Sequence, residues 1–170
     1  MLKIYCRFLA ALDPLFHATN FYYFPLKGLM DDVKPVTPEE TATYENIDFD
    51  VHDFKNDMKA PKLINDGDKI KTLMARWRFP SLSLHGIEGA FSEPGQKTVI
   101  PRKVTGKFSI RIVPNQTPEK VEEIVLKYLN KKWEERGSSN SMKAQMCHGG
   151  RAWVSDPEHP NYLAGMTYVI

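Results

Sequence analysis

Several places in the chain carry side chains that could do chemistry. Cys147 and His148 are adjacent, which places a nucleophile next to a base in sequence. We predict a strand over 142–147 that ends at His148, and neighbouring side chains of a strand point to opposite faces, so a thiol hydrolase is not supported. His148 precedes Gly149 and Gly150, where the backbone can approach a ligand closely. His148 is therefore either an ordinary edge histidine or a ligand contact.

Carboxylates offer little for acid–base or metal chemistry. The pairs at 39–40 and 122–123 fall in polar helical contexts, where charged faces are normally solvated, and we interpret them as structural. The segment 156–159 has ligand-type side chains, but its spacing does not complete the coordination shell of a metal ion. We predict that the purified chain binds no stoichiometric zinc or manganese at neutral pH.

The composition limits the class of protein. A length of 170 residues suits one domain, and 42% hydrophobic with 26% charged residues excludes a disordered or fibrous chain. Basic residues exceed acidic ones by 23 − 21 = +2, so the charge balance does not indicate a nucleic-acid partner. Cys6 and Cys147 lie far apart and in no CxxC spacing, which favours a reducing compartment over a disulfide framework.

The segment 1–26 is expected to be an appended arm. Its apolar run at 8–12 is ended by Asp13-Pro14, far short of a signal-peptide core or a membrane span. Its aromatic stretch at 21–24 has neither a helical nor an alternating period. We predict weaker hydrogen-exchange protection here than in the strand around Phe108.

Short helices are predicted before the first clear strand. Thr37 is suited to cap one of them, and Glu40 completes a capping box three residues later. Another is expected around 51–54, and a third over 68–76 follows a turn at 65–67.

Beyond Pro80 the pattern alternates as in β-strands, first at 81–85 and most clearly at 107–112. Apolar side chains of the second strand point one way, so Arg111 stands on the face away from the apolar core. There it could clamp a carboxylate or form a surface salt bridge.

The strongest helix pattern begins at Thr117 and ends at Gly137. Its apolar stripe consists of Val121, Ile124, Val125, Tyr128 and Leu129. With the strand at 142–147, these elements predict an α/β (α+β) sandwich, in which an antiparallel-rich sheet carries helices on one face.

Four segments in register resemble the M20 metallopeptidases, closest to the cytosolic non-specific and carnosine dipeptidases. They are SLSLHGIEGAF at 81–91, KTVIPRK at 97–103, GKFSIRIVP at 106–114, and HGG with WVSD within 148–156. The resemblance implies a lid domain that dimerises and closes over substrate. It also implies a separate catalytic domain with two divalent ions, zinc or manganese.

The resemblance is partial. The family's metal ligands, its general base and the lid histidine of its His-Ser-Gly motif have no counterpart in this sequence. It divides the chain into a divergent arm at 1–26, a partial lid or dimerisation domain at 27–165, and a divergent tail at 166–170.

Three residues match family positions that contact substrate. Thr98 resembles a threonine presented across the dimer, Arg111 the arginine that holds the substrate carboxylate, and His148 the histidine near the substrate carbonyl. We expect all three to converge on one concave surface, with Arg111 and His148 opening to the same side within one chain. His85 matches no family residue with a known role, and packing is its expected function.

The sequence is therefore interpreted as a truncated or alternatively spliced form of a cytoplasmic metallo-dipeptidase, consisting mainly of the lid and inactive alone. The expected partners are a dipeptide in the full-length enzyme and a second copy or the full-length protein. A regulatory module that pairs with the full-length enzyme is the alternative, and an unrelated ligand-binding domain would require the four motifs to be accidental.

Overall fold

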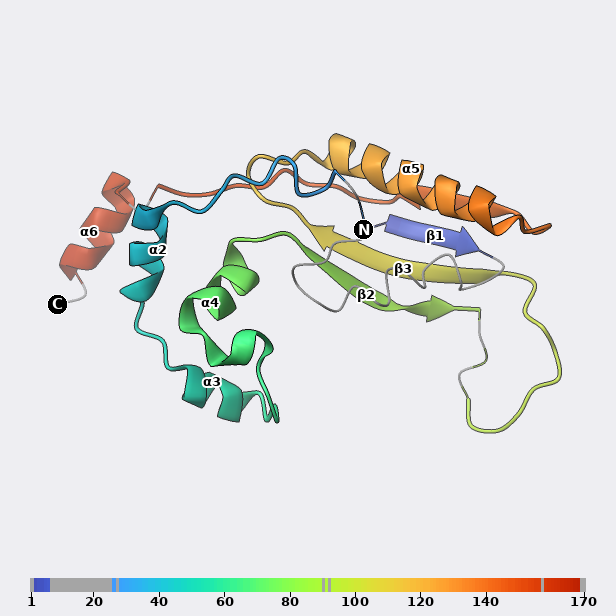
Figure 1. Cartoon of the computed structure of the whole chain (residues 1–170), viewed down its shortest axis with the longest axis horizontal. Helices are drawn as coiled ribbons and strands as arrows, with labels where there is room; N and C mark the ends of the chain where they lie inside the picture. Colours follow the sequence, from blue (N-terminus) through green and yellow to red (C-terminus); the bar gives the residue numbers. More distant parts are fainter. Residues whose placement is uncertain are drawn as a thin grey trace.

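The computed structural model describes residues 2–6, 26, 28–89, 91, 93–156 and 158–168. Its strands are β1 (Leu2–Cys6), β2 (Ser81–Glu88), β3 (Val104–Arg111) and β4 (Met142–Met146). Its helices are α2 (Pro38–Glu45), α3 (Val51–Asp57), the 3-10 turn η2 (Ile64–Gly67), α4 (Lys69–Trp77), α5 (Pro118–Arg136) and α6 (Pro160–Tyr168). The described strands form one antiparallel four-stranded sheet in the order β2-β3-β1-β4. Figure 1 shows α5 lying along one face of this sheet, as the α/β sandwich predicts.

The central position of β1 differs from the expected arm. Leu2 lies opposite Phe108 of β3 on one side and Met146 of β4 on the other, so β1 links strands that are distant in sequence. Leu26, which we also assigned to the arm, is only 2% exposed and belongs to the apolar core. The remaining arm, at 7–25, lies outside the described residues.

Helix α5 supplies one side of the core. Thr117 caps it by accepting a hydrogen bond from the backbone N–H of Lys120, and Gly137 ends it with a left-handed φ of 60°. The predicted stripe faces the sheet, with Val121, Val125 and Leu129 buried against Phe108. Because β3 alternates, the side chains of Ile110 and Ile112 join this face. The sandwich is held by apolar burial between α5 and the sheet.

The buried Gln116 side chain ties the start of the chain to the segment that precedes α5. Its Nε2 donates to the Leu29 carbonyl at 2.5 Å, and its Oε1 accepts from the Val113 N–H at 3.1 Å. Both groups of a buried amide are thereby satisfied, as burial in a low-dielectric core requires. The sequence pattern did not identify this contact, because Leu29 and Gln116 are far apart in the chain.

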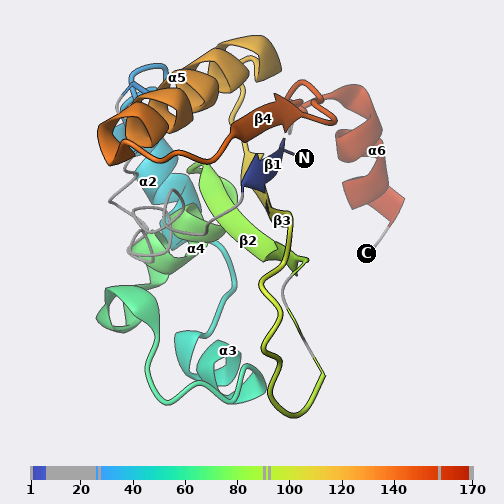
Figure 2. The same cartoon turned by 90° about the vertical axis from the view of Figure 1, so that its right-hand side faces the viewer.

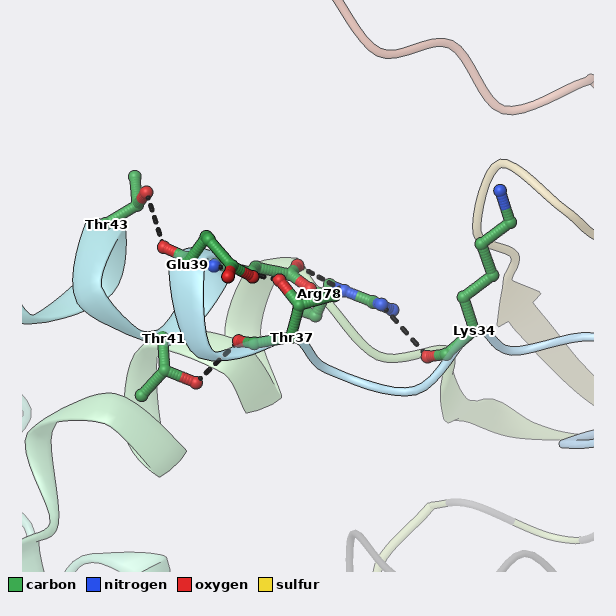
Figure 3. Close-up of polar contacts among 7 residues, drawn as sticks. Lys34, Thr37, Glu39, Thr41, Thr43 and Arg78 are labelled. Carbon is green, nitrogen blue, oxygen red and sulfur yellow. Dashed lines mark hydrogen bonds and ion pairs between the residues drawn. The ribbon is translucent and has the colours of Figure 1, made fainter.

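Helices α2 and α4 are joined by a part-buried ion pair. Thr37 Oγ1 accepts from the Glu40 N–H, which confirms half of the predicted capping box. The Glu40 carboxylate instead accepts from Arg78 Nε at 2.5 Å, and Arg78 Nη2 donates to the Lys34 carbonyl at 3.0 Å (Figure 3). This arginine fixes the end of α4 against the start of α2.

Helix α6 lies at the C-terminal end of the described chain. In Figure 2, α6 lies apart from α3 and α4. Tyr162, Leu163 and Met166 on α6 expose 50%, 47% and 61% of their surfaces, and Trp153 before it exposes 80%. None of the helices within the described residues is long and apolar enough to cross a membrane.

Candidate functional site

Arg111 ends β3 and projects away from the apolar core, as the alternation predicts. Its Nη2 donates to the carbonyls of Ala75 at 3.2 Å and Phe79 at 3.1 Å, both near the end of α4. These bonds hold one terminal nitrogen of the guanidinium against the end of α4 and the residues that follow it, while Arg111 remains exposed. Arg111 therefore has a fixed position and a solvent-accessible charge.

Arg111 lines a cavity of about 780 Å³ between the helical segment and β2. We call it the α3–α4 cavity. Its lining residues come from α3, the chain up to η2, α4, β2 and the end of β3: Phe54, Met58, Ala60, Lys62, Leu63, Ile64, Asn65, Thr72, Ala75, Arg76, Ser81, Leu82, Ser83 and Arg111.

His148 lies in a different and smaller hollow, of about 210 Å³. Ile110 and Ile112 of β3 and Glu122 of α5 also line it, on the α5 side of the sheet. An added Cβ on Gly149 would lie 2.8 Å from Pro118 Cβ, so a side chain there would collide with the first turn of α5. We predicted that the backbone here could approach a ligand closely, whereas the close neighbour of Gly149 in the structure is the first turn of α5.

The expectation that Arg111 and His148 open to one side of the sheet is wrong for the single chain. Ile110 and Ile112 line the hollow that contains His148, and successive side chains of a strand alternate between faces. Arg111, which lies between them, must project to the other face, where it lines the α3–α4 cavity. The chain by itself therefore does not bring these two residues together.

Thr98 lies on the exposed loop between β2 and β3. This loop enters β3 at Val104, whereas Arg111 ends the same strand, and a rise of about 3.4 Å per residue separates the two strand ends by roughly 24 Å. Figure 1 shows the loop extending beyond that end of the hairpin, away from α4. Thr98 and Arg111 of one chain thus belong to opposite ends of the hairpin.

His85 is placed where β2 shifts its register against β3, between Leu84 and Gly86. Its Nε2 lies 2.6 Å from Ser109 Oγ across the two strands. This contact supports a structural role at a β-bulge.

Sequence reasoning missed the contribution of α4 to the surroundings of Arg111. Thr72, Ala75 and Arg76 all face the α3–α4 cavity. The sequence did contain a signal for this surface: within the predicted helix at 68–76, Thr72 and Arg76 lie one helical turn apart. Only the packing of α4 beside β3 shows that these positions share a surface with Arg111.

We expect Thr72→Val to stabilise the chain by about 1 kcal/mol. Thr72 Oγ1 is buried without a hydrogen-bond partner among the described residues, and a methyl group of similar size removes that unsatisfied hydroxyl. Urea unfolding followed by circular dichroism measures the change. Thr41→Val is the control, because the Thr41 hydroxyl donates to the Thr37 carbonyl at 3.0 Å on an exposed surface. Equal effects of the two substitutions would contradict the prediction.

The described residues do not provide a metal centre. No group of three or more His, Cys, Asp and Glu side chains within the described ranges is arranged to hold a metal ion. The residues that could act on a ligand are instead the cations of the α3–α4 cavity and the separate His148 hollow.

Comparison with known proteins identifies the family of this chain. The family model for the peptidase dimerisation domain of the M20 class matches residues 2–137. The chain belongs to this family. Its match begins at residue 2, in agreement with the central place of β1 in the sheet.

The curated relatives of this M20 dimerisation domain include dipeptidases. The Cys-Gly metallodipeptidase dug1 of Schizosaccharomyces pombe is 46% identical over 140 residues, which are 82% of this chain and 29% of that protein. The Beta-Ala-His dipeptidase of Homo sapiens is 45% identical over 137 residues, 81% of this chain and 27% of that protein. The chain therefore spans less than a third of the length of either curated relative.

Solved structures agree with these matches. Human carnosine dipeptidase 1 superimposes with a TM-score of 0.86 at 38% identity, covering 96% of this chain and 38% of that chain. Dug1p of Saccharomyces cerevisiae gives a TM-score of 0.81 at 33% identity, covering 98% and 38% respectively. The arrangement of sheet and helices in this chain is thus similar to one part of each of these two larger proteins.

Proposed function

We propose that this chain forms the dimerisation and lid portion of a metal-dependent dipeptidase and contributes substrate contacts. The proposal rests on the family match and on relatives named for Cys-Gly and Beta-Ala-His dipeptides. Hydrolysis by the parent enzyme would use two divalent ions, zinc or manganese, held by residues other than the described ones. We propose that the chain alone is inactive, and that it acts in the cytoplasm.

The observation that carries the lid assignment is the exposed loop between β2 and β3. Val99 and Ile100 expose 77% and 85% of their surfaces, although both are large apolar residues. Adjacent exposed apolar side chains on a projecting loop are typical of a surface that a partner covers. We propose that the partner is a second copy of this domain.

The proposed substrate site is composite. Thr98 and Arg111 of one chain belong to opposite ends of the β2–β3 hairpin. Thr98 would therefore act in the substrate site of the partner copy. Arg111 would hold the carboxylate of the peptide, because a guanidinium binds carboxylates through paired hydrogen bonds. His148 would contact the substrate carbonyl from its separate hollow, in which case the complete site needs surfaces beyond this single chain.

A non-catalytic module that pairs with a full-length dipeptidase is the second candidate. The exposed apolar residues of the β2–β3 loop also suit that role, because they would bind the equivalent loop region of a longer protein. Mixed-species sedimentation with a full-length dipeptidase distinguishes the candidates. If this chain associates with the full-length dipeptidase, the regulatory role is supported. If it associates only with copies of itself, its role as a dimerisation domain is supported.

We expect Ile100→Asp to weaken self-association of the chain by about tenfold or more, because a charge replaces an apolar side chain in a contact that excludes water. Sedimentation velocity over a concentration series measures the change. Trp153→Ser is the control, since Trp153 is 80% exposed but lies outside the loop. A wild-type chain that stays monomeric at all concentrations, or equal losses in both variants, would contradict the proposal.

A further inference from the structure

His148 lies on a segment without regular secondary structure. The strand β4 ends at Met146, and residues 147–150 belong to neither a helix nor a strand. Within the described residues β4 is also an edge strand, which pairs with β1 on one side only. The sheet therefore does not by itself fix the path of the chain at His148, and contacts from another element have to contribute.

Helix α5 contacts this segment just before His148. Glu122 Oε1 accepts a hydrogen bond from the backbone N–H of Met146 at 3.3 Å. Glu122 also lines the hollow of about 210 Å³ that contains His148. The neighbouring Glu123 is exposed and is not part of that lining. One of two adjacent carboxylates on α5 thus reaches the end of β4, and the other does not.

Helix α5 contacts the segment again just after His148. An added Cβ on Gly149 would lie 2.8 Å from Pro118 Cβ and 3.1 Å from Met146 Cε, so the backbone here lies directly against the first turn of α5. His148 comes two residues after the Glu122 contact and one residue before this one. The backbone on both sides of His148 is therefore held by α5.

We propose that Glu122 is a positioning residue for His148. Its hydrogen bond to Met146 fixes the end of β4 and thereby directs the His148 imidazole into the hollow. The inference rests on the proposed role of His148 at the substrate carbonyl, because a donor has to be held in place to stabilise charge that develops there. Glu122 acts through the Met146 backbone, so the role requires an acceptor oxygen at the reach of a glutamate rather than a negative charge.

Three substitutions of Glu122 distinguish reach from charge. Glu122→Gln keeps a side-chain oxygen at the same reach, so it should keep His148 in place. Glu122→Asp keeps the charge but is one methylene shorter, so it should release His148. Glu122→Ala removes the acceptor while alanine favours the helix, and it should release His148 as well. Glu123→Ala is the matched control and should change nothing, because Glu123 is exposed beside the hollow lining.

The position of His148 is measured by NMR on the isotope-labelled 170-residue chain. One readout is the nuclear Overhauser effect between the His148 ring protons and the methyl groups of Ile110 and Ile112, which line the same hollow. The other is hydrogen exchange of the Met146 amide. We expect Glu122→Ala and Glu122→Asp to lose the Overhauser effects and to exchange this amide about tenfold faster. A merely structural role of Glu122 would lower the free energy of unfolding without moving the His148 ring.

Several results would overturn the inference. They are the absence of these Overhauser effects in the unmodified chain, a Glu122→Asp variant that behaves like Glu122→Gln, or equal losses in Glu122→Ala and Glu123→Ala. Glu122→Asp answers the question by itself if the alanine variant fails to fold, because it keeps the charge on α5.

The test is separable from the dimerisation experiment. A chain that self-associates but keeps His148 in the hollow without Glu122 overturns this inference alone. A monomeric chain in which the position of His148 depends on Glu122 overturns only the dimer.

Discussion

Replacing Phe108 with alanine is expected to lower the free energy of unfolding by about 3–5 kcal/mol. Phe108 is fully buried at 0% exposure and lies beneath Val125 and Leu129 of α5. It is opposite Leu2 of β1 and Leu84 of β2, so the cavity left by the substitution would open at the centre of the sheet. Single domains have about 5–15 kcal/mol of total stability, so this loss removes a large share of it.

Urea unfolding of the Phe108→Ala chain, followed by circular dichroism, measures this change. Phe91→Ala is the matched control, because Phe91 is 43% exposed and contacts Lys97 on the surface rather than the core. The control should cost about 1 kcal/mol or less. A Phe108 variant as stable as the Phe91 variant would show that β3 and α5 do not share a single core.

Local patterns predicted the parts of the fold that depend on local physics. The alternation at 107–112 placed Phe108 inside and Arg111 outside, and the structure has both. The cap at Thr117 and the stop at Gly137 bounded α5, because hydrogen bonds of helix ends are satisfied by residues within a few positions. These features need no knowledge of distant segments.

The central strand β1, unlike β3 and α5, could not be predicted from local patterns. Leu2, Ile4 and Cys6 do alternate with polar or amphipathic residues, but a run of this length is indistinguishable from an irregular segment without its partners. Those partners, β3 and β4, follow roughly a hundred residues later or more. Pairing at such separation depends on the packing of the whole sheet rather than on local propensity.

The candidate site likewise has one part that local patterns predict and another that depends on distant segments. The outward direction of Arg111 followed from the period of its strand, whereas His148 lies just beyond the end of β4, where strand alternation no longer fixes direction. The close approach of Gly149 to Pro118 decides its surroundings instead. The three residues of the resemblance thus lie on three different surfaces of one chain, and only the proposed composite site would bring Thr98 to Arg111, through a second copy.

Replacing Gly89 with alanine is expected to cost about 2–4 kcal/mol and to weaken self-association as well. Gly89 has a φ of +90°, and an added Cβ would lie 2.2 Å from the Lys103 carbonyl oxygen, which is a backbone atom with little room to move. The two ends of the β2–β3 loop would have to separate. Because Thr98 and Ile100 lie on this loop, the change would move the surface that we propose contacts the partner.

Gly95→Ala distinguishes the cost of backbone strain from the cost of a steric collision in the same loop. Gly95 also has a positive φ, of +106°, but no atom lies within 4 Å of an added Cβ. Its substitution should therefore cost only the backbone strain, about 1–2 kcal/mol, and leave the base of the loop intact. Urea unfolding and sedimentation velocity, applied to both variants, measure the two effects separately. If Gly95→Ala weakened association as much as Gly89→Ala, the collision at the base of the loop would not be the cause of the weakening, and the predicted effect of Gly89→Ala on association would be wrong.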